Sequence, residues 1–360
     1  MGRPLLGYAA RVSMPPDPHD ATSCDAPAPC DDVRIVVDPG PPARTVEKVR
    51  DVLASRLRER LGVTSLTVDA ETLTLGPEGD LLVPELVERT RRHSSVAAVV
   101  TEFPRIRGRR EVMVEINRER CTALVSLPAL GLVPNRRLVG VVVDAVHRLR
   151  DPDATSSMRG AHWSSGDGTE SLSTRSSFGR TRMVLGMVRG NRPWRLIPTL
   201  TGVMAAAAAT ASFGVFYSSI WAMANKLSPW RLAGLSVLAV LVMTVWLIAN
   251  NRLWEKRGAL PAYRARLYNA ATTLTIVLNA AVLYAGLFVV ALCTALAVID
   301  SGYLAGQIGG DLGFRGYVCL AWLATSMGTV AGAVGSSADS YDDILSATYG
   351  HRERARRQRE

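Results

Sequence analysis

Four stretches of the chain carry no charged residue, and each is long enough to cross a bilayer. A spanning helix needs roughly 20 mostly apolar residues, and backbone groups surrounded by lipid must bond within their own segment. The pattern therefore predicts four transmembrane helices within a membrane domain of residues 199–338. The four charge-free stretches are Leu196–Asn225, Leu232–Asn251, Leu267–Ile299 and Gly316–Ala338, and we expect the helices over about 199–224, 232–251, 270–298 and 316–337.

Before residue 150 the pattern is that of an α/β domain. Apolar residues at three- and four-residue spacing predict helices over 45–60, 81–94 and 138–149. We expect Thr45 to cap the first of these helices and Gly62 to close it. Strands alternating with helices predict a mixed sheet layered with helices over 33–150. The runs with strand character are 33–38, 66–75, 96–103, 112–116 and 123–127.

Four other segments differ in composition from these two domains. Residues 1–32 are rich in Pro, Asp and Ala and are expected to be a disordered leader without a secretory signal. Residues 151–178 are rich in Ser and Gly, which is typical of a flexible linker. Residues 179–198 are basic and amphipathic, which predicts a juxtamembrane segment lying in the interface. Its expected membrane anchors are Arg189, Arg192, Trp194 and Arg195, and a basic tail covers 339–360.

Arginine and lysine alternate in number along the connections between the apolar stretches. Five precede the first stretch, two follow it, and the next two connections hold five and one. The C-terminal tail again holds five. Short cytoplasmic connections carry the excess of basic residues. The pattern predicts a multi-pass protein of the inner (plasma) membrane with both termini in the cytoplasm.

The net charge of +10 is explained by the same residues. Because most of the excess arginine flanks the apolar stretches, we expect anionic lipids as partners, and no nucleic acid. The five cysteines show no paired spacing, so we expect unpaired thiols in a cytosolic domain, without a metal or cofactor.

Several motifs resemble a family of uncharacterised actinobacterial integral membrane proteins. The resemblance covers most of residues 33–350. It implies an N-terminal cytosolic α/β domain, a linker and four transmembrane helices, but no activity. The segments that carry it are GMVRGNRPWRLIP (Gly186–Pro198), LYNAATT (Leu267–Thr273), AWLATSMGTVAGAVG (Ala321–Gly335) and SLPALG (Ser126–Gly131).

Polar residues at expected strand ends are the candidate ligand-binding residues: Glu102, Arg105, Arg107 and Ser126. Ligands of α/β sheets bind at strand ends, so these side chains could hold an anion. Alternatively, Pro104 and Pro128 only end strands and the arginines face water or lipid. Asp144 and His147 share a helix face, but two ligands do not make a metal site.

Within the membrane domain, Asn279 lies near the middle of the third stretch. It is either a substrate contact or the donor of an interhelical hydrogen bond. Gly328 and Gly332 allow close helix approach, within the bundle or between copies of the chain in a homo-oligomer.

These features predict a membrane-anchored scaffold or regulatory module without catalytic activity, whose α/β domain binds a protein or a small ligand. The alternatives are a transporter or export component with a cytosolic regulatory domain, and a membrane-bound hydrolase with its site near Glu102 and Ser126.

Overall fold

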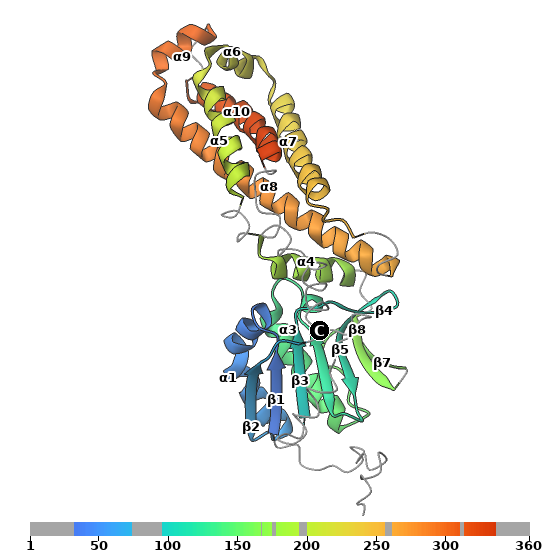
Figure 1. The fold of residues 1–360 in the computed structure, drawn as a ribbon. Helices are drawn as coiled ribbons and strands as arrows, with labels where there is room; N and C mark the ends of the chain where they lie inside the picture. The colour runs from blue at the N-terminus through green and yellow to red at the C-terminus, as the bar shows by residue number, and fades with distance from the viewer. Residues whose placement is uncertain are drawn as a thin grey trace, which may run out of the picture.

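The computed structural model describes residues 32–73, 96–166, 168–174, 178–193, 200–255, 261–309 and 313–335. An N-terminal domain with a mixed sheet is followed by an all-helical region, which confirms the expected fold class (Figure 1). The helix expected over 81–94, the leader before residue 32 and the tail over 339–360 lie outside the described residues.

One sheet in the order β2-β1-β3-β6-β5-β8-β7 forms the centre of the N-terminal domain, and β4 pairs with β5. Neighbouring strands from β2 to β6 are parallel, and the pairs beyond β6 are antiparallel. The carboxyl ends of the four parallel strands therefore meet at one edge. The strands are β1 (Asp32–Val37), β2 (Ser65–Ala70), β3 (Val96–Thr101), β4 (Arg105–Arg107), β5 (Arg110–Asn117), β6 (Thr122–Ser126), β7 (Ala161–Gly166) and β8 (Thr169–Thr174).

Helices α1 (Pro41–Leu61) and α3 (Pro134–Arg150) pack against each other and against the sheet. Alternate residues of a strand face opposite sides. Val96, Ala98 and Val100 of β3 belong to the main core with these two helices, whereas Val99 belongs to a smaller cluster. The apolar alternation in the sequence thus places the main core between the sheet and α1 and α3.

The ends of α1 test two expectations. Gly62 closes the helix in the left-handed conformation (φ 66°), as expected. Thr45 is not the cap, because the helix already begins at Pro41 and Gly40 occupies the cap position. The Thr45 hydroxyl instead donates to the carbonyl of Pro41 at 2.7 Å. Proline at the first helical positions loses no hydrogen bond, so Pro41 and Pro42 start the helix rather than prevent it.

The flexible linker expected over 151–178 is wrong for its second part. Strands β7 and β8 pair as an antiparallel hairpin, and β8 pairs antiparallel with β5. Leu172 is fully buried, and Arg148 stacks over the Trp163 ring at 5.7 Å. Ser and Gly dominate the composition, but backbone pairing with β5 and these few large side chains hold the hairpin in place.

Within the described part of the helical region, three helices are long and apolar enough to span a membrane, or four if a bent pair counts as one span. Its outward faces carry large exposed apolar side chains such as Val245 and Val289. Extended apolar surface of this kind indicates a lipid environment. The helices are α4 (Gly179–Asn191), α5 (Thr201–Phe216), α6 (Ser218–Lys226), α7 (Pro229–Asn250), α8 (Ala262–Val298), α9 (Ser301–Ile308) and α10 (Gly313–Gly335).

The first expected span is broken. Helices α5 and α6 meet at an angle of 86° at Tyr217, which is extended. The break frees backbone carbonyls, and the indole of Trp221 donates to the carbonyl of Val215 at 2.7 Å. At the same end of the bundle, Trp221 contacts Tyr303 of α9 edge to face (Figure 1). A run without charges cannot reveal such a bend, because both arms are apolar.

Helix α10 lies at the centre of the bundle and packs against α5, α7 and α8 (Figure 1). A Cβ added at Gly328 would lie 2.5 Å from the carbonyl oxygen of Ala207, and one at Gly332 would lie 3.0 Å from that of Val203. The two glycines therefore allow α10 to approach α5 within the same chain. This settles where the small-residue surface packs: inside the bundle.

Helix α8 extends beyond the bundle into the α/β domain. Its 37 residues span about 55 Å, whereas the hydrocarbon core of a bilayer is about 30 Å thick. Leu267, Tyr268 and Ala271, near its start, belong to the main core of the sheet domain. The start of the third apolar stretch thus lies in the core of the α/β domain, and the rest of it lies in the bundle.

Candidate functional site

Two of the predicted ligand-binding residues lie together but serve the fold. The guanidinium of Arg105 donates to Glu115 Oε2 through Nε and Nη2, at 2.9 and 2.6 Å. Its backbone N–H donates to Ser126 Oγ at 3.2 Å, and this hydroxyl donates to the carbonyl of Phe103 at 2.9 Å. Ser126 is fully buried. These contacts fix the crossing from β3 to β4.

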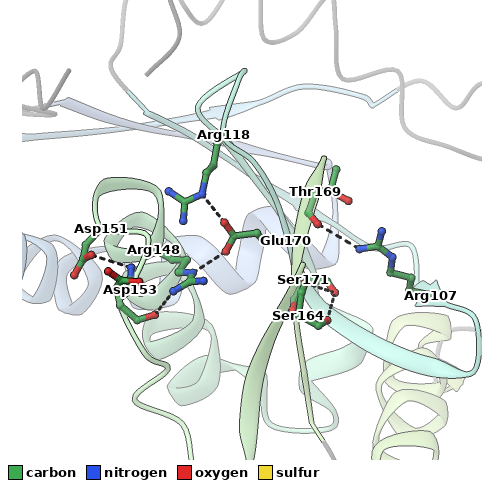
Figure 2. A network of polar contacts seen from close by, with 10 residues as sticks. Arg107, Arg118, Arg148, Asp151, Asp153, Ser164, Thr169, Glu170 and Ser171 are labelled. Atoms are coloured by element: carbon green, nitrogen blue, oxygen red, sulfur yellow. Dashed lines mark hydrogen bonds and ion pairs between the residues drawn. The ribbon is translucent and has the colours of Figure 1, made fainter. Parts of the chain in front are cut away.

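Arg107 contacts the β7–β8 turn. Its guanidinium donates to the carbonyl oxygens of Gly166 and Thr169 (Figure 2). Glu102 is buried at the end of β3, and its backbone N–H donates to the carboxylate of Asp38. The structure therefore does not bring the side chains of the four predicted residues together around one ligand.

A second polar cluster lies at Glu170 on β8. Arg118 and Arg148 both donate to its carboxylate, the latter at 2.7 Å (Figure 2). Burial raises the pKa of Glu170, but the hydrogen bonds and positive charges of the two arginines outweigh this effect. The pKa lies below its ordinary value of 4.5. The cluster ties the hairpin to the β5–β6 turn and to α3.

Asp144, one of the two residues considered as metal ligands, has other partners. The buried carboxylate of Asp144 accepts hydrogen bonds from the hydroxyls of Ser156 and Ser157, at 2.7 and 2.8 Å. In the described ranges, no three His, Cys, Asp or Glu side chains gather into a group that could hold a metal ion. One cysteine expectation is wrong: Cys121 is disulfide-bonded. Its partner lies outside the described residues.

An open cavity of about 540 Å³ lies at the carboxyl edge of the parallel strands. Residues from the start of α1, the start of α3 and the end of α4 line it. Four basic side chains line it, and among the described residues no acidic side chain does so. These four are Arg44 and Lys48 of α1, together with Arg189 and Arg192 at the end of α4.

Two expected membrane anchors therefore line a cavity of the α/β domain. Arg189 donates to the hydroxyl of Thr45 at 3.1 Å, which joins α4 to α1. Arg192 adopts a left-handed backbone conformation (φ 50°), and its Nη2 is buried without a hydrogen-bond partner. Trp194 and Arg195 lie outside the described residues. Sequence reasoning assigned the arginines to headgroups because it had no means of placing α4 beside α1.

Helix α4 packs against protein on its apolar side. A helix was expected here, and the structure contains one, but Met183 and Met187 are fully buried in the core of the sheet domain. A Cβ added at Gly186 would lie only 2.1 Å from the carbonyl oxygen of Pro128. Glycine thus permits α4 to pack directly on the turn that follows β6.

Arg44 and Lys48 were missed as site residues. One sequence signal could have found them. A long helix begins directly after a strand, its first turn contains no acidic residue, and basic residues follow at four-residue spacing. Acidic residues normally favour a helix start and basic residues oppose it. A positively charged helix start that directly follows a strand therefore indicates an anion-binding site.

Asn279 makes no interhelical hydrogen bond to any described residue. Both polar atoms of its amide are buried without a partner. The interhelical polar contacts instead centre on Tyr284, whose hydroxyl lies 2.9 Å from Ser236 of α7 and 2.9 Å from Ser326 of α10. Asn279 is therefore buried in the bundle, but the hydrogen bond that was one of its two alternatives is not formed with a described residue.

Comparison with known proteins adds no relative. No protein-family model matches the chain, and neither a curated protein nor a solved structure shows significant similarity to it.

Proposed function

We propose that this protein is a membrane-anchored regulatory module without catalytic activity of its own. Its α/β domain binds a protein or a small ligand, and its helical region responds. The observation that carries this proposal is the shared core: α8 begins inside the α/β domain and continues into the bundle. A change in the sheet domain then acts on a spanning helix directly, without a flexible tether between them.

Hydrogen bonds also connect α8 to the α/β domain. The hydroxyl of Tyr263 at the start of α8 donates to Glu111 of β5. Farther along α8, the hydroxyl of Thr275 accepts a hydrogen bond from the amide of Asn191 at 2.9 Å, at the end of α4. Both Asn191 and Thr275 are buried. Buried hydrogen bonds are costly to break, so they favour one fixed orientation of α8 against the domain.

The proposed location is the inner (plasma) membrane, with the α/β domain in the cytoplasm. The start of α5, the end of α7 and the end of α10 all lie on the side of the bundle that faces the sheet domain (Figure 1). The connections with many basic residues belong to this side, which supports a cytoplasmic orientation. Anionic lipids are the partners that these connections favour.

Distances between the two regions test the proposal. Spin-labelled amino acids are placed at Ser55 on α1 and Asn250 at the end of α7, both exposed, in the full chain in lipid nanodiscs. We expect one narrow distance distribution from double electron–electron resonance. The double substitution Leu267→Ala and Tyr268→Ala, which empties the shared core, should broaden it.

A matched control is the double substitution Leu238→Ala and Val245→Ala. These side chains of α7 are 55% and 64% exposed on the outside of the bundle, so the distribution should stay narrow. A broad distribution in the unmodified chain would show a freely moving domain and would refute the regulatory proposal.

Transport across the membrane is a second candidate, and Asn279 favours it. Buried polar groups without partners cost free energy and often mark a functional position in a membrane. The broken first span adds support, because interrupted helices line the binding sites of many transporters. In a chain with Cys293→Ala and Cys319→Ala, Asn279→Cys should react with a membrane-impermeant thiol reagent, beyond the reaction of the same chain with Asn279 unchanged, if water reaches this position. An unreactive cysteine contradicts transport through this position.

A further inference from the structure

The proposed function above assigns no ligand to the basic cavity between α1, α3 and α4. Its charge is the first unexplained feature. Arg44, Lys48, Arg189 and Arg192 line one cavity, and none of its lining residues carries a negative charge. Like charges gathered in one place repel each other, so the arrangement lowers the stability of the empty domain. A bound anion would remove this cost.

The described acidic residues nearest to the cavity in the sequence do not line it. Glu47 and Asp51 of α1 are exposed, and Glu47 lies 3.9 Å from Arg50. Before the helix, the nearest carboxylate belongs to Asp38, which follows β1. It accepts hydrogen bonds from the hydroxyl of Thr101 at 2.8 Å and from the backbone N–H groups of Glu102 and Leu73. Asp38 is fully buried and does not line the cavity. The carboxylate of Asp38 therefore accepts its hydrogen bonds at the edge of the sheet and not in the cavity.

Two helix starts add to the positive potential. Pro41 of α1 and Pro134 of α3 both line the cavity. Neither helix has a side-chain cap or an acidic residue in its first turn. The partial positive charge at each start thus remains uncompensated by the helix itself, and it favours an anion in front of it.

Arg192 is held in place for a ligand. Its backbone lies in the left-handed region, which is uncommon and strained for a residue other than glycine. Its Nη2 lies close to Gly40, since a Cβ added there would be 3.5 Å away. This nitrogen is buried and has no hydrogen-bond partner. A strained backbone that positions an unpartnered guanidinium beside three other cations is typical of an anion site.

The size and the surroundings of the cavity narrow the ligand class. A volume of about 540 Å³ lies in the range of small-molecule sites and exceeds what a single phosphate fills. Leu132 and Val133, which are 51% and 73% exposed, line both this cavity and an adjoining groove with Phe178. The ligand therefore carries a phosphate and an apolar or extended remainder.

We propose that this cavity binds a phosphate-bearing anion, supplied either by the headgroup of an anionic lipid or by a soluble phosphorylated compound. Arg192 and Arg44 contact the phosphate, and Arg189, fixed by Thr45, closes the site from α4. The exposed apolar residues beside the cavity favour the lipid source.

Binding by the purified full chain in a neutral detergent tests this proposal. The probes are dihexanoyl phosphatidylglycerol, dihexanoyl phosphatidylcholine and inorganic pyrophosphate, and thermal unfolding is followed at increasing probe concentration. We expect stabilisation by the glycerol lipid, by pyrophosphate, or by both, and none by the choline lipid. Stabilisation by the glycerol lipid alone would identify a lipid headgroup as the source of the phosphate. Stabilisation by pyrophosphate would identify a soluble phosphorylated compound.

The double substitution Arg44→Gln and Arg192→Gln should weaken binding of the anionic probe about tenfold or more, because each lost charge-assisted hydrogen bond contributes roughly 1.5–3 kcal/mol. The control Arg56→Gln with Arg58→Gln removes the same charge from exposed positions of α1 outside the cavity and should leave the affinity within about twofold. Without a probe, the cavity variant should unfold at the same or a higher temperature. If it fails to fold, Lys48→Gln alone, at an exposed position, replaces it.

Three results would overturn the proposal: no anionic probe stabilises the protein, both lipids do so equally, or the cavity and control variants bind alike. None of these results depends on the coupling between the two regions, so they leave the regulatory proposal standing.

Discussion

Substitution of Gly186 by alanine tests how closely α4 is joined to the sheet domain. The new Cβ would lie 2.1 Å from the carbonyl oxygen of Pro128 and 2.8 Å from its carbonyl carbon. Carbon–oxygen contacts are normally about 3.3–3.6 Å, so α4 must move by on the order of 1 Å. The obstacle is buried backbone of the 3-10 turn Pro128–Leu130, which cannot rotate aside as a long side chain can.

The cost follows from the packing that this movement disturbs. Met183 and Met187 of α4 are fully buried, and overpacking at such an interface typically costs about 1–3 kcal/mol. Alanine also favours the helix over glycine by about 1 kcal/mol, which partly hides the loss. A control with the same helix gain is therefore needed. Gly140 of α3 provides it, because the nearest atom to its added Cβ is the flexible Met158 side chain at 4.0 Å.

Amide hydrogen exchange on the full chain in detergent measures the difference. We expect core strands β3 and β6 to exchange about 5- to 150-fold faster in the Gly186→Ala protein than in the Gly140→Ala protein. The Gly140→Ala protein should match or exceed the protection of the unmodified chain. Equal exchange in the two variants would show that α4 does not pack on Pro128 and is not joined closely to the sheet domain.

Three further results are expected. Glu170→Gln should lower the unfolding temperature of the α/β domain at pH 7. The difference from the unmodified protein should become smaller below pH 4.5, because a carboxylate whose pKa is lowered in the folded state loses its stabilising effect as it becomes protonated. A difference that does not change with pH contradicts this. Asn279→Leu should raise the unfolding temperature in detergent, since it removes two buried unpartnered atoms at similar volume; a lower temperature would indicate a polar partner. Gly328→Ala should destabilise the bundle by about 1–3 kcal/mol, whereas Gly286→Ala, with open space around its Cβ, should not; equal unfolding temperatures refute close packing of α10 on α5.

Much of the fold follows from the hydrophobic pattern. Buried parallel strands read as continuous apolar runs, and β3, with all six residues buried, shows this in VAAVVT. Charge-free stretches located α7, α8 and α10 because lipid excludes charge over a fixed length. These signals are local in the sequence. They depend on the solvent that each face meets and not on which distant segment lies beside it.

Features that depend on distant partners could not be predicted in this way. The β7–β8 hairpin has a linker composition, and only its pairing with β5 makes it part of the sheet. Arg105 and Arg107 looked like anion ligands because their partners, Glu115 and the turn at Gly166, cannot be assigned from spacing. The basic cavity, in contrast, was missed. Its basic residues come from α1 and the end of α4, more than 140 positions apart, and only packing brings them together.

The central claim is that one continuous helix, α8, begins in the core of the α/β domain and continues into the bilayer. Nitroxide accessibility along α8 in lipid nanodiscs tests it most directly. Labels at Val282 and Val289 should be accessible to oxygen but not to a water-soluble nickel complex. A label at Arg266 should be accessible to the nickel complex, and labels at Leu267 and Tyr268 should be shielded from both. Lipid accessibility at Leu267 and Tyr268, or nickel accessibility at Val289, would contradict the claim.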